Sequence, residues 1–283
     1  MSHIIIQGLA LSGLYALVAV GFTMIFSVGR VLNLAHGAYL MLGGYVYYSS
    51  VQVLGIPKAG GFLLAVLAGV GFGMLTYAVL VRRLAHNPIA VEISTLILAV
   101  VMQALIVLIF GQVPKSMWPI VQGVLRYEDV FVTYNILLAM VASWVVLGGL
   151  LLFVHRTRTG RAIRAVSMDR KGALISGIDP HRTNLVTWAV SGALGALAGV
   201  FFATYTQLHP GMWVAPLIIA VAVVIVGGIG SIVGSLVVAH VIGFMETVTT
   251  TVIAAELRGV FTMALIIVVL IVAPKGLFGR REL

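Results

Sequence analysis

The side chains best suited to chemistry are concentrated in one segment of an otherwise apolar chain. Residues 155–182 contain seven of the 17 lysine and arginine residues, and long hydrophobic runs flank the segment on both sides. A short basic loop between membrane spans marks the cytoplasmic side of a membrane protein. We therefore predict that residues 155–182 form a cytoplasmic loop. The seven residues are Arg156, Arg158, Arg161, Arg164, Arg170, Lys171 and Arg182.

The same segment has the pattern of two short helices joined by a bend near residues 167–169. Asp169 can cap the second helix, and Gly177 can end it in the left-handed conformation. Arg161 and Arg164 are three residues apart and share a face of the first helix. The segment could be a solvated loop that only sets topology, or a surface to which another protein docks. Docking is favoured by an apolar set that a solvated loop does not need: Ala162, Ile163, Val166, Ala173, Leu174, Ile175 and Ile178.

A second group of candidates lies near the start of the chain, where Asn33, His36 and Gly37 interrupt apolar sequence. Polar groups at membrane depth are costly, and they often line a solute pathway or join helices. Alternatively, these residues lie at the cytoplasmic boundary and mark a break between two helices. We favour the helix break over a direct contact with solute.

Glycines interrupt the apolar sequence again at residues 227–231. Gly227, Gly228, Gly230 and Ser231 could form an unwound segment beside a solute pathway, as broken helices do in transporters. They could equally form a tight cytoplasmic turn between two spans. The pattern does not distinguish these alternatives.

Few other polar side chains lie within the predicted spans. Ser94, Thr95 and Gln103 could face a pore, although such residues more often bond to their own helix or to a neighbour. An acid inside a membrane is a functional candidate, but Glu246 is predicted near the outer end of its span, where its carboxylate would reach the interface. The spans therefore lack the buried charges that proton-coupled carriers need.

Motifs for catalysis are absent from the sequence. The pattern GxxxxGK[ST] does not occur, so the chain has no phosphate-binding loop of that kind. There is no HExxH, no cysteine and no Ser-His-Asp grouping. We predict that the chain is not an enzyme and holds no cofactor or metal. The net charge of +9 does not indicate nucleic-acid binding, because the basic residues lie in loops between spans.

The elements that carry these residues are predicted to be membrane-spanning helices. Hydrophobic residues make up 61% of the chain, charged residues 9%, and the mean hydropathy is +1.15, whereas soluble domains carry about 25% charged residues. We expect an all-α integral membrane protein, a polytopic bundle of about eight transmembrane helices with broken or re-entrant segments. The apolar runs are roughly 4–28, 38–54, 61–81, 89–110, 131–154, 183–205 and 260–273, and residues 212–255 cross twice or re-enter.

The distribution of charge predicts which ends face the cytoplasm. With residues 155–182 inside, counting spans places all basic residues inside except Lys58, Lys115, Arg126 and Arg258. This count requires residues 212–255 to cross twice. The N-terminus is then outside and the C-terminus cytoplasmic.

Two stretches of the chain are similar to each other. Residues 9–22 read LALSGLYALVAVGF, and residues 188–201 read WAVSGALGALAGVF. Small residues dominate membrane helices, so we attribute the similarity to chance and predict no internal repeat.

Several blocks, in order along most of the chain, resemble the branched-chain amino acid (LivH-like) permease family of ABC importers. The family's coupling loop, G-x-A-x-R-A-x-x-x-D-x-x-x-A-x-x-x-G-I, is similar to the stretch from Gly160 to Ile178. Its N-terminal block resembles GLALSGLYALVAVGFTMIFSVGRVLNLAHGAYLMLGGY, and its glycine-rich block resembles GGIGSIVGSLVVA. Its C-terminal block resembles VLIVAPKGLFG, although Ala273 stands where the family often has arginine.

The resemblance implies a type II ABC importer-like permease, with one transmembrane domain over residues 1–283 and a coupling loop at residues 155–182. It implies a bacterial inner (cytoplasmic) membrane location and a second permease, more often a different chain than a copy. Two cytoplasmic ATP-binding subunits would hold ATP and Mg, and an extracytoplasmic protein would bind the solute. That solute would be a branched-chain amino acid or a related small polar molecule, and nothing in the spans selects among them.

A stand-alone secondary carrier and a purely structural membrane subunit are the alternatives to an importer.

The candidate residues have two predicted roles, ATPase coupling and the solute pathway or a helix break. The residues that the resemblance assigns to ATPase coupling are Gly160, Arg161, Arg164, Asp169, Ala173, Gly177 and Ile178. The candidates for the pathway or a helix break are Asn33, His36, Gly37, Ser94, Thr95, Gln103, Gly227, Gly228, Gly230 and Ser231.

Overall fold

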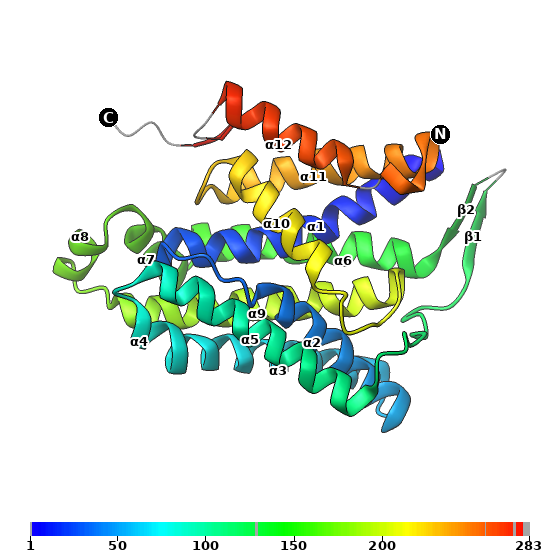
Figure 1. Cartoon of the computed structure of the whole chain (residues 1–283), viewed down its shortest axis with the longest axis horizontal. Helices are drawn as coiled ribbons and strands as arrows, with labels where there is room; N and C mark the ends of the chain where they lie inside the picture. Colours follow the sequence, from blue (N-terminus) through cyan, green and yellow to red (C-terminus); the bar gives the residue numbers. More distant parts are fainter. Residues whose placement is uncertain (1, 128–129, 258, 274–275, 280–283) are drawn as a thin grey trace.

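Long helices lie side by side along most of the molecule (Figure 1). The structure is a computed structural model, and it describes residues 2–127, 130–257, 259–273 and 276–279. Within these ranges, seven helices are long and apolar enough to cross a membrane, and α10 is a shorter apolar helix. The predicted all-α polytopic membrane fold is therefore confirmed.

The elements follow one another in this order. The first part of the chain contains α1 (Ser2–Gly29), α2 (His36–Tyr48) with η1 (Ser49–Val53), α3 (Lys58–Leu75) with η2 (Thr76–Val81) and α4 (Arg82–Leu84), and α5 (Pro88–Phe110). The middle contains β1 (Val124–Tyr127), β2 (Val130–Thr133), α6 (Tyr134–Arg156), α7 (Arg158–Met168) and α8 (Arg170–Ile175). The last part contains α9 (Pro180–Tyr205), α10 (Val214–Gly227), α11 (Ile232–Val248) with η3 (Thr249–Ile253), η4 (Ala255–Leu257) and α12 (Val260–Val272).

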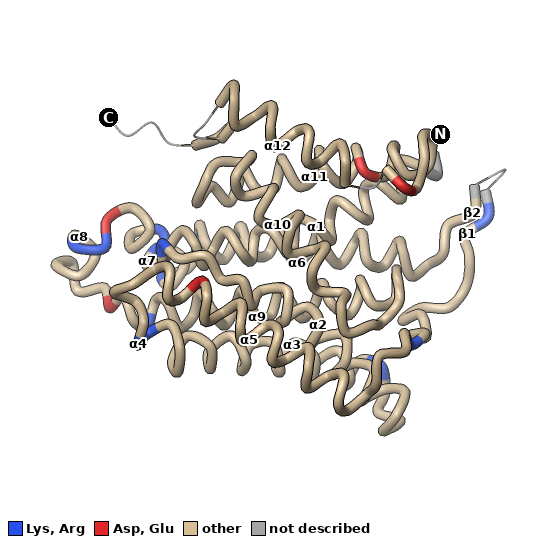
Figure 2. Tube along the Cα trace, viewed as in Figure 1, with Lys and Arg blue, Asp and Glu red and all other residues tan. Residues whose placement is uncertain are grey.

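The two ends of the bundle differ in charge. Lysines and arginines gather around α4, α7 and α8, and we call this the basic end (Figure 2). The opposite end carries the start of α1 and the β1–β2 hairpin (Figure 1). The C-terminal segment returns to the basic end, because Leu277 N donates a hydrogen bond to Val226 O of α10 at 2.8 Å.

The hairpin at the opposite end was not predicted from the sequence. β1 pairs antiparallel with β2, with Val124 opposite Thr133 and Arg126 opposite Phe131. The Arg126 guanidinium lies 5.7 Å from the centre of the Phe131 ring, a favourable cation–π contact. Because residues 130–133 form a strand, α6 begins at Tyr134, later than the sequence indicated.

Helices α1 and α9 form the centre of the bundle. The most apolar part of α1 is 89% buried and that of α9 is 72% buried, compared with 17% for α5. Membrane helices associate through close packing of small residues, because lipid removes the hydrophobic drive between helices. Gly69 of α3 meets Gly192 of α9, Gly199 of α9 meets the backbone of α2, and Gly243 of α11 meets Ser12 of α1. At each contact an added Cβ would collide with backbone.

Two helices begin in the middle of the bundle. Residues 30–35 run back from the end of α1 as an irregular segment, and α2 starts at His36, beside Val18 in the middle of α1. Residues 206–213 likewise lead back from the end of α9 to the start of α10. The starts of α2 and α10 meet, because a Cβ on Gly37 would lie 2.7 Å from Trp213 O.

These two parts of the chain have an inverted arrangement. The unit of α1, an irregular segment and α2 runs in the opposite direction to the unit of α9, an irregular segment and α10 (Figure 1). The similar stretches 9–22 and 188–201 lie in α1 and α9 respectively. The similarity that the sequence assigned to chance thus has a structural counterpart of the inverted-repeat type found in transporters.

Candidate functional site

The basic end is built on two short helices, α7 and α8, placed between α6 and α9. Thr157 Oγ1 accepts a hydrogen bond from Gly160 N at 2.9 Å and caps the start of α7. Asp169 Oδ1 accepts one from Lys171 N at 2.9 Å and caps the start of α8. Gly177 follows with a φ of 81°, which favours glycine. The two predicted helices, their bend and the caps at Asp169 and Gly177 are confirmed.

The apolar side chains of this segment face in two directions. Ile163, Val166 and Ala173 are buried against the bundle, whereas Leu174 is 61% exposed and Ile175 is 87% exposed. The apolar set that favoured docking is therefore divided, because three of its members attach the loop to the bundle, and docking by the exposed members stays a prediction. The surface left for a partner is the α8 knob, which consists of Met168, Leu174 and Ile175 with the exposed Arg170 and Lys171.

The residues that the resemblance assigned to coupling divide in the same way. Gly160 and Ala173 are buried and Ile178 is half-buried, so these three support the loop from inside. The others are exposed: Arg161, Arg164, Asp169 and Gly177.

Close packing and hydrogen bonds attach α7 to the bundle. A Cβ on Gly160 would collide with Phe153 O and Val154 Cα, so only glycine allows α7 to cross the end of α6. Arg30, the first residue after α1, donates from Nη2 to Ser167 O at 3.1 Å. This contact links α7 to the irregular segment that leads to α2.

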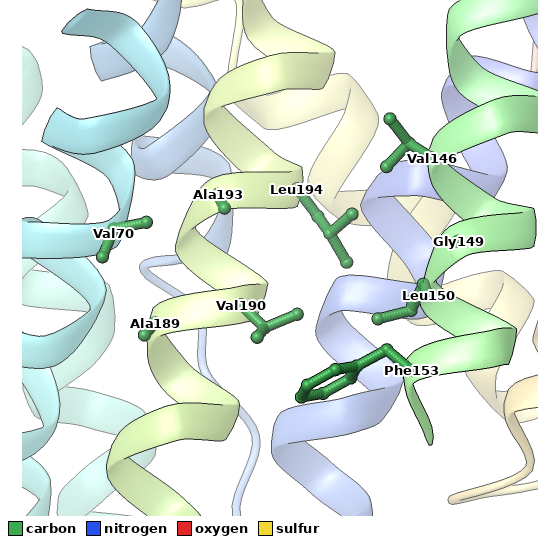
Figure 3. Close-up of a pocket in the computed structure, with 9 residues that line it drawn as sticks. All are labelled: Val70, Val146, Gly149, Leu150, Phe153, Ala189, Val190, Ala193 and Leu194. Atoms are coloured by element: carbon green, nitrogen blue, oxygen red, sulfur yellow. The ribbon is translucent and has the colours of Figure 1, made fainter. Parts of the chain in front are cut away.

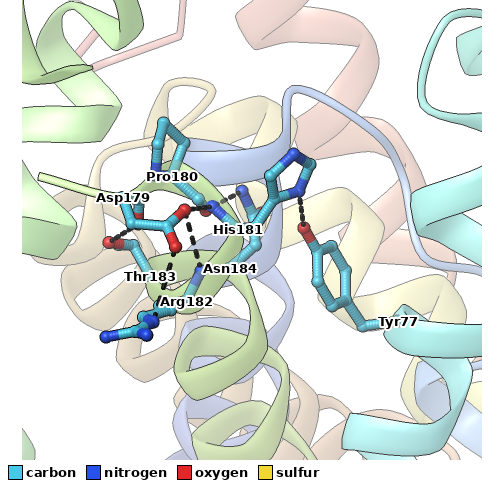
Figure 4. Close-up of polar contacts among 7 residues, drawn as sticks. All are labelled: Tyr77, Asp179, Pro180, His181, Arg182, Thr183 and Asn184. Atoms are coloured by element: carbon cyan, nitrogen blue, oxygen red, sulfur yellow. Dashed lines mark hydrogen bonds and ion pairs between the residues drawn. The ribbon is translucent and has the colours of Figure 1, made fainter.

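Polar contacts also hold the start of α9 (Figure 4). Asp179 Oδ1 accepts hydrogen bonds from His181 N at 2.8 Å and Arg182 N at 3.4 Å, and the first of these is the main reason that the pKa of the Asp179 carboxyl is lowered. Its Oδ2 lies 3.5 Å from Arg182 Nε. The His181 Nδ1 and the Tyr77 hydroxyl are 3.1 Å apart, which joins α9 to η2. Residues 155–182 are thus attached to the end of α6, to the segment that follows α1, and to η2.

Several sequence candidates meet at the irregular segment between α1 and α2. Asn33 is buried; its Oδ1 accepts a hydrogen bond from Ala35 N and its Nδ2 donates to the Tyr39 hydroxyl, both at 3.1 Å. Thr95 Oγ1 of α5 accepts one from Leu34 N at 3.1 Å. Irregular backbone inside a membrane needs such partners, because lipid offers none. Asn33 and Thr95 therefore stabilise the break.

His36 ties three helices together at the start of α2. Its Nε2 lies 2.9 Å from Val18 O of α1, and its Nδ1 lies 3.2 Å from Ser191 Oγ of α9. The prediction that His36 lies at the cytoplasmic boundary is wrong, because residues 30–35 carry it back to the middle of α1. Both ring nitrogens already have partners, so the structural role of the break outweighs a direct contact with solute.

Gln103 of α5 contacts the second irregular segment, the one that leads to α10. Its Oε1 accepts a hydrogen bond from Trp213 Nε1 at 2.7 Å, which joins α5 to the start of α10. A pocket of about 230 Å³ lies beside it. The pocket is lined by Gln103, Val107, Gln112, Pro114, His209, Pro210 and Gly211. It is a recess of mixed polarity between α5 and the segment that leads into α10.

The remaining candidates lie elsewhere. Ser94 is half-buried on α5 and takes no part in the contacts described above. The glycine-rich segment forms a tight turn between α10 and α11 at the basic end, with φ values of 94° at Gly228 and 84° at Gly230. Ser231 Oγ accepts a hydrogen bond from Gly234 N at 3.0 Å and caps α11. Of the two alternatives for Gly227, Gly228, Gly230 and Ser231, the structure has the turn.

Two polar contacts were missed from the sequence. Glu246 is only 3% exposed and accepts a hydrogen bond from the Tyr15 hydroxyl at 2.8 Å, so the prediction that it reaches the interface is wrong. Its helix continues through η3, which places Glu246 deeper than expected. Trp213 was not a candidate, although its position after Pro210 and Gly211 is a signal for the start of a helix.

Comparisons with known proteins cover nearly the whole chain. The model of the family described as "Branched-chain amino acid transport system / permease component" matches residues 4–270. The high-affinity branched-chain amino acid transport system permease protein BraD of Pseudomonas aeruginosa is 27% identical, over 98% of this chain and 95% of its own length. Its counterpart LivH of Escherichia coli is 28% identical, over 98% and 94%.

The name of a more distant relative gives another substrate. The ribose import permease protein RbsC of Escherichia coli is 25% identical, over 82% of this chain and 73% of its own length. No solved structure matches the chain. Since the family model matches from the first turns of α1 into α12, the chain belongs to the family of branched-chain amino acid transport system permease components.

Proposed function

We propose that the chain is the membrane-spanning permease subunit of an ATP-driven ABC importer for branched-chain amino acids or a related small polar solute. The α8 knob is the observation that carries this proposal. Its apolar side chains are exposed, although the helices that carry them are capped and attached to the bundle. Exposed apolar patches that are surrounded by polar groups mark interaction sites. The partners are two ATP-binding subunits that bind ATP and Mg, because the chain has no phosphate-binding loop of its own.

The unburied helices support the following assembly. The basic end faces the cytoplasm of a bacterial inner membrane, with the N-terminus outside and the C-terminus inside. A second permease, preferably a different chain, covers α5 and α12, whose spans are 17% and 12% buried. The solute passes between the two permeases, and an extracytoplasmic solute-binding protein delivers it to the opposite end.

The contacts of α7 connect the ATP-binding subunits with the pathway. Closure of these subunits around ATP moves the α8 knob, and the hydrogen bond from Arg30 to Ser167 passes the movement to the irregular segment. Leu34 N in that segment donates a hydrogen bond to Thr95 Oγ1 of α5. In this mechanism α5 changes position relative to the second permease and opens the pathway to each side in turn.

Reconstitution tests the proposal. The chain, its companion permease and candidate ATP-binding subunits are placed in proteoliposomes, and ATP hydrolysis and solute uptake are measured with the solute-binding protein present. Asp169→Ala removes the cap of α8 and should lower subunit assembly and uptake, whereas Asp169→Asn keeps a capping oxygen and should retain both. Uptake in the absence of any ATP-binding subunit would contradict the proposal and support a stand-alone secondary carrier.

A further inference from the structure

An apolar groove lies on the surface of the bundle and ends near the basic end. It runs between α6 and α9, with α1 behind it (Figure 3). Its volume is about 300 Å³. Val146, Gly149 and Phe153 of α6 line one side, and Val190 and Leu194 of α9 point toward them (Figure 3). Ala189 and Ala193 lie on the side of α9 toward Val70 of α3, which also lines the groove. The small residues leave the groove open, and its lining suits a hydrocarbon.

Arginines stand at the basic end of this groove on both sides. Arg156 follows Phe153 by three residues and Gly149 by seven, so it continues the groove-lining face of α6. Arg182 precedes Ala189 by seven residues and continues the part of the groove lining that Ala189 forms on α9. Both side chains are exposed, and Arg182 shares its charge with Asp179, 3.5 Å away.

We propose that the groove binds one acyl chain of an anionic phospholipid, with the phosphate of the headgroup held between Arg156 and Arg182. The charge of the two arginines complements that of the phosphate, and basic sites between membrane helices at the cytoplasmic surface bind such headgroups. The apolar lining ends where the arginines begin, as the acyl chain ends where the headgroup begins.

Lipid binding to the full chain tests this site. The purified protein is delipidated in detergent, and binding of phosphatidylglycerol and of phosphatidylcholine with the same acyl chains is measured by native mass spectrometry and by the shift in Tm. We expect phosphatidylglycerol to bind more tightly. Arg156→Gln with Arg182→Gln should weaken its binding by about fivefold for each arginine and leave phosphatidylcholine unchanged. Gly149→Leu should fill the groove and weaken both lipids.

Matched variants separate the groove from general effects. Gly148 is the neighbour of Gly149 on α6, does not line the groove, and like Gly149 has no atom within 4 Å of an added Cβ. Gly148→Leu should therefore leave lipid binding unchanged. Arg82→Gln with Arg83→Gln removes equal charge from α4 at the same end and should have no effect. The proposal is overturned if the two lipids bind equally, if either control weakens binding as much as its test variant, or if Gly149→Leu disrupts permease pairing and not lipid binding.

Discussion

The α8 knob gives a quantitative test of how the permease meets its ATP-binding subunits. Complete burial of a leucine or isoleucine side chain is worth about 1.5–3 kcal/mol. Ile175 is 87% exposed and Leu174 is 61% exposed, so most of this free energy is available to a partner. We expect Leu174→Ser with Ile175→Ser to weaken binding by about 3 kcal/mol, which is about a 100-fold increase in Kd.

The assay measures the Kd of an isolated ATP-binding subunit for the permease in lipid nanodiscs by biolayer interferometry. The matched control is Ile229→Ser, because Ile229 is 56% exposed at the same end but lies outside the knob, in the turn between α10 and α11. The Tm of each variant should equal that of the wild type, since these side chains touch little of the bundle. A Kd that the double variant leaves within threefold of the wild type, or that Ile229→Ser raises equally, would refute the reasoning.

Three further predictions concern the bundle itself. Gly199→Ala should lower stability by about 1–3 kcal/mol, because its Cβ meets the backbone of α2, whereas Gly149→Ala should not; thermal unfolding in detergent compares them. Glu246→Leu leaves the buried Tyr15 hydroxyl without this acceptor and should cost about 1–2 kcal/mol, whereas Glu246→Gln keeps an acceptor and should cost less; the same melts measure this. The pKa of the Asp179 carboxyl is lowered, so the ionised carboxylate stabilises the folded protein above the ordinary carboxyl pKa. This stabilisation is lost as pH falls through the lowered pKa. Asp179→Ala should therefore reduce Tm at pH 7 but not at strongly acidic pH.

Most of the architecture could be predicted because hydropathy and charge are local properties of the chain. The apolar runs located the long helices, and Asp169 and Gly177 located α8, since a cap depends on only a few neighbouring residues. The depth of His36 could not be predicted in this way. An irregular segment that runs back into the bundle has no local signature, because its partners come from α1, α5 and α9.

In the candidate site, too, local features could be predicted from the sequence and features that depend on distant contacts could not. Composition identified the apolar residues between 162 and 178, but it could not show that Ile163 faces the bundle while Ile175 is exposed. That difference depends on where α7 and α8 lie relative to α6 and α9. Glu246 was misplaced for a related reason, because its depth depends on the continuation of α11 into η3.

The distribution of glycine indicates which helices are free to move. α1, α3, α9 and α11 contain glycines that bring their backbones into contact, whereas α5 and α12 contain none. Among the polar contacts of the described residues, α5 is joined to the broken segments by Thr95 and Gln103. These bonds are few and specific, and they can exchange partners without disrupting a packed interface. We infer that α5 shifts as a unit against a rigid centre.

Spin labels test this inference directly, because the chain has no cysteine and pairs can be introduced at will. Leu67 on α3, Val101 on α5 and Val241 on α11 are all exposed. Double electron–electron resonance should give a broader distance distribution for the 67–101 pair than for the 67–241 pair. Binding of ATP to the assembled transporter should shift the first distance and leave the second unchanged. If both pairs are equally narrow and neither moves, α5 belongs to the rigid centre, and the pathway must open by movement of whole permeases.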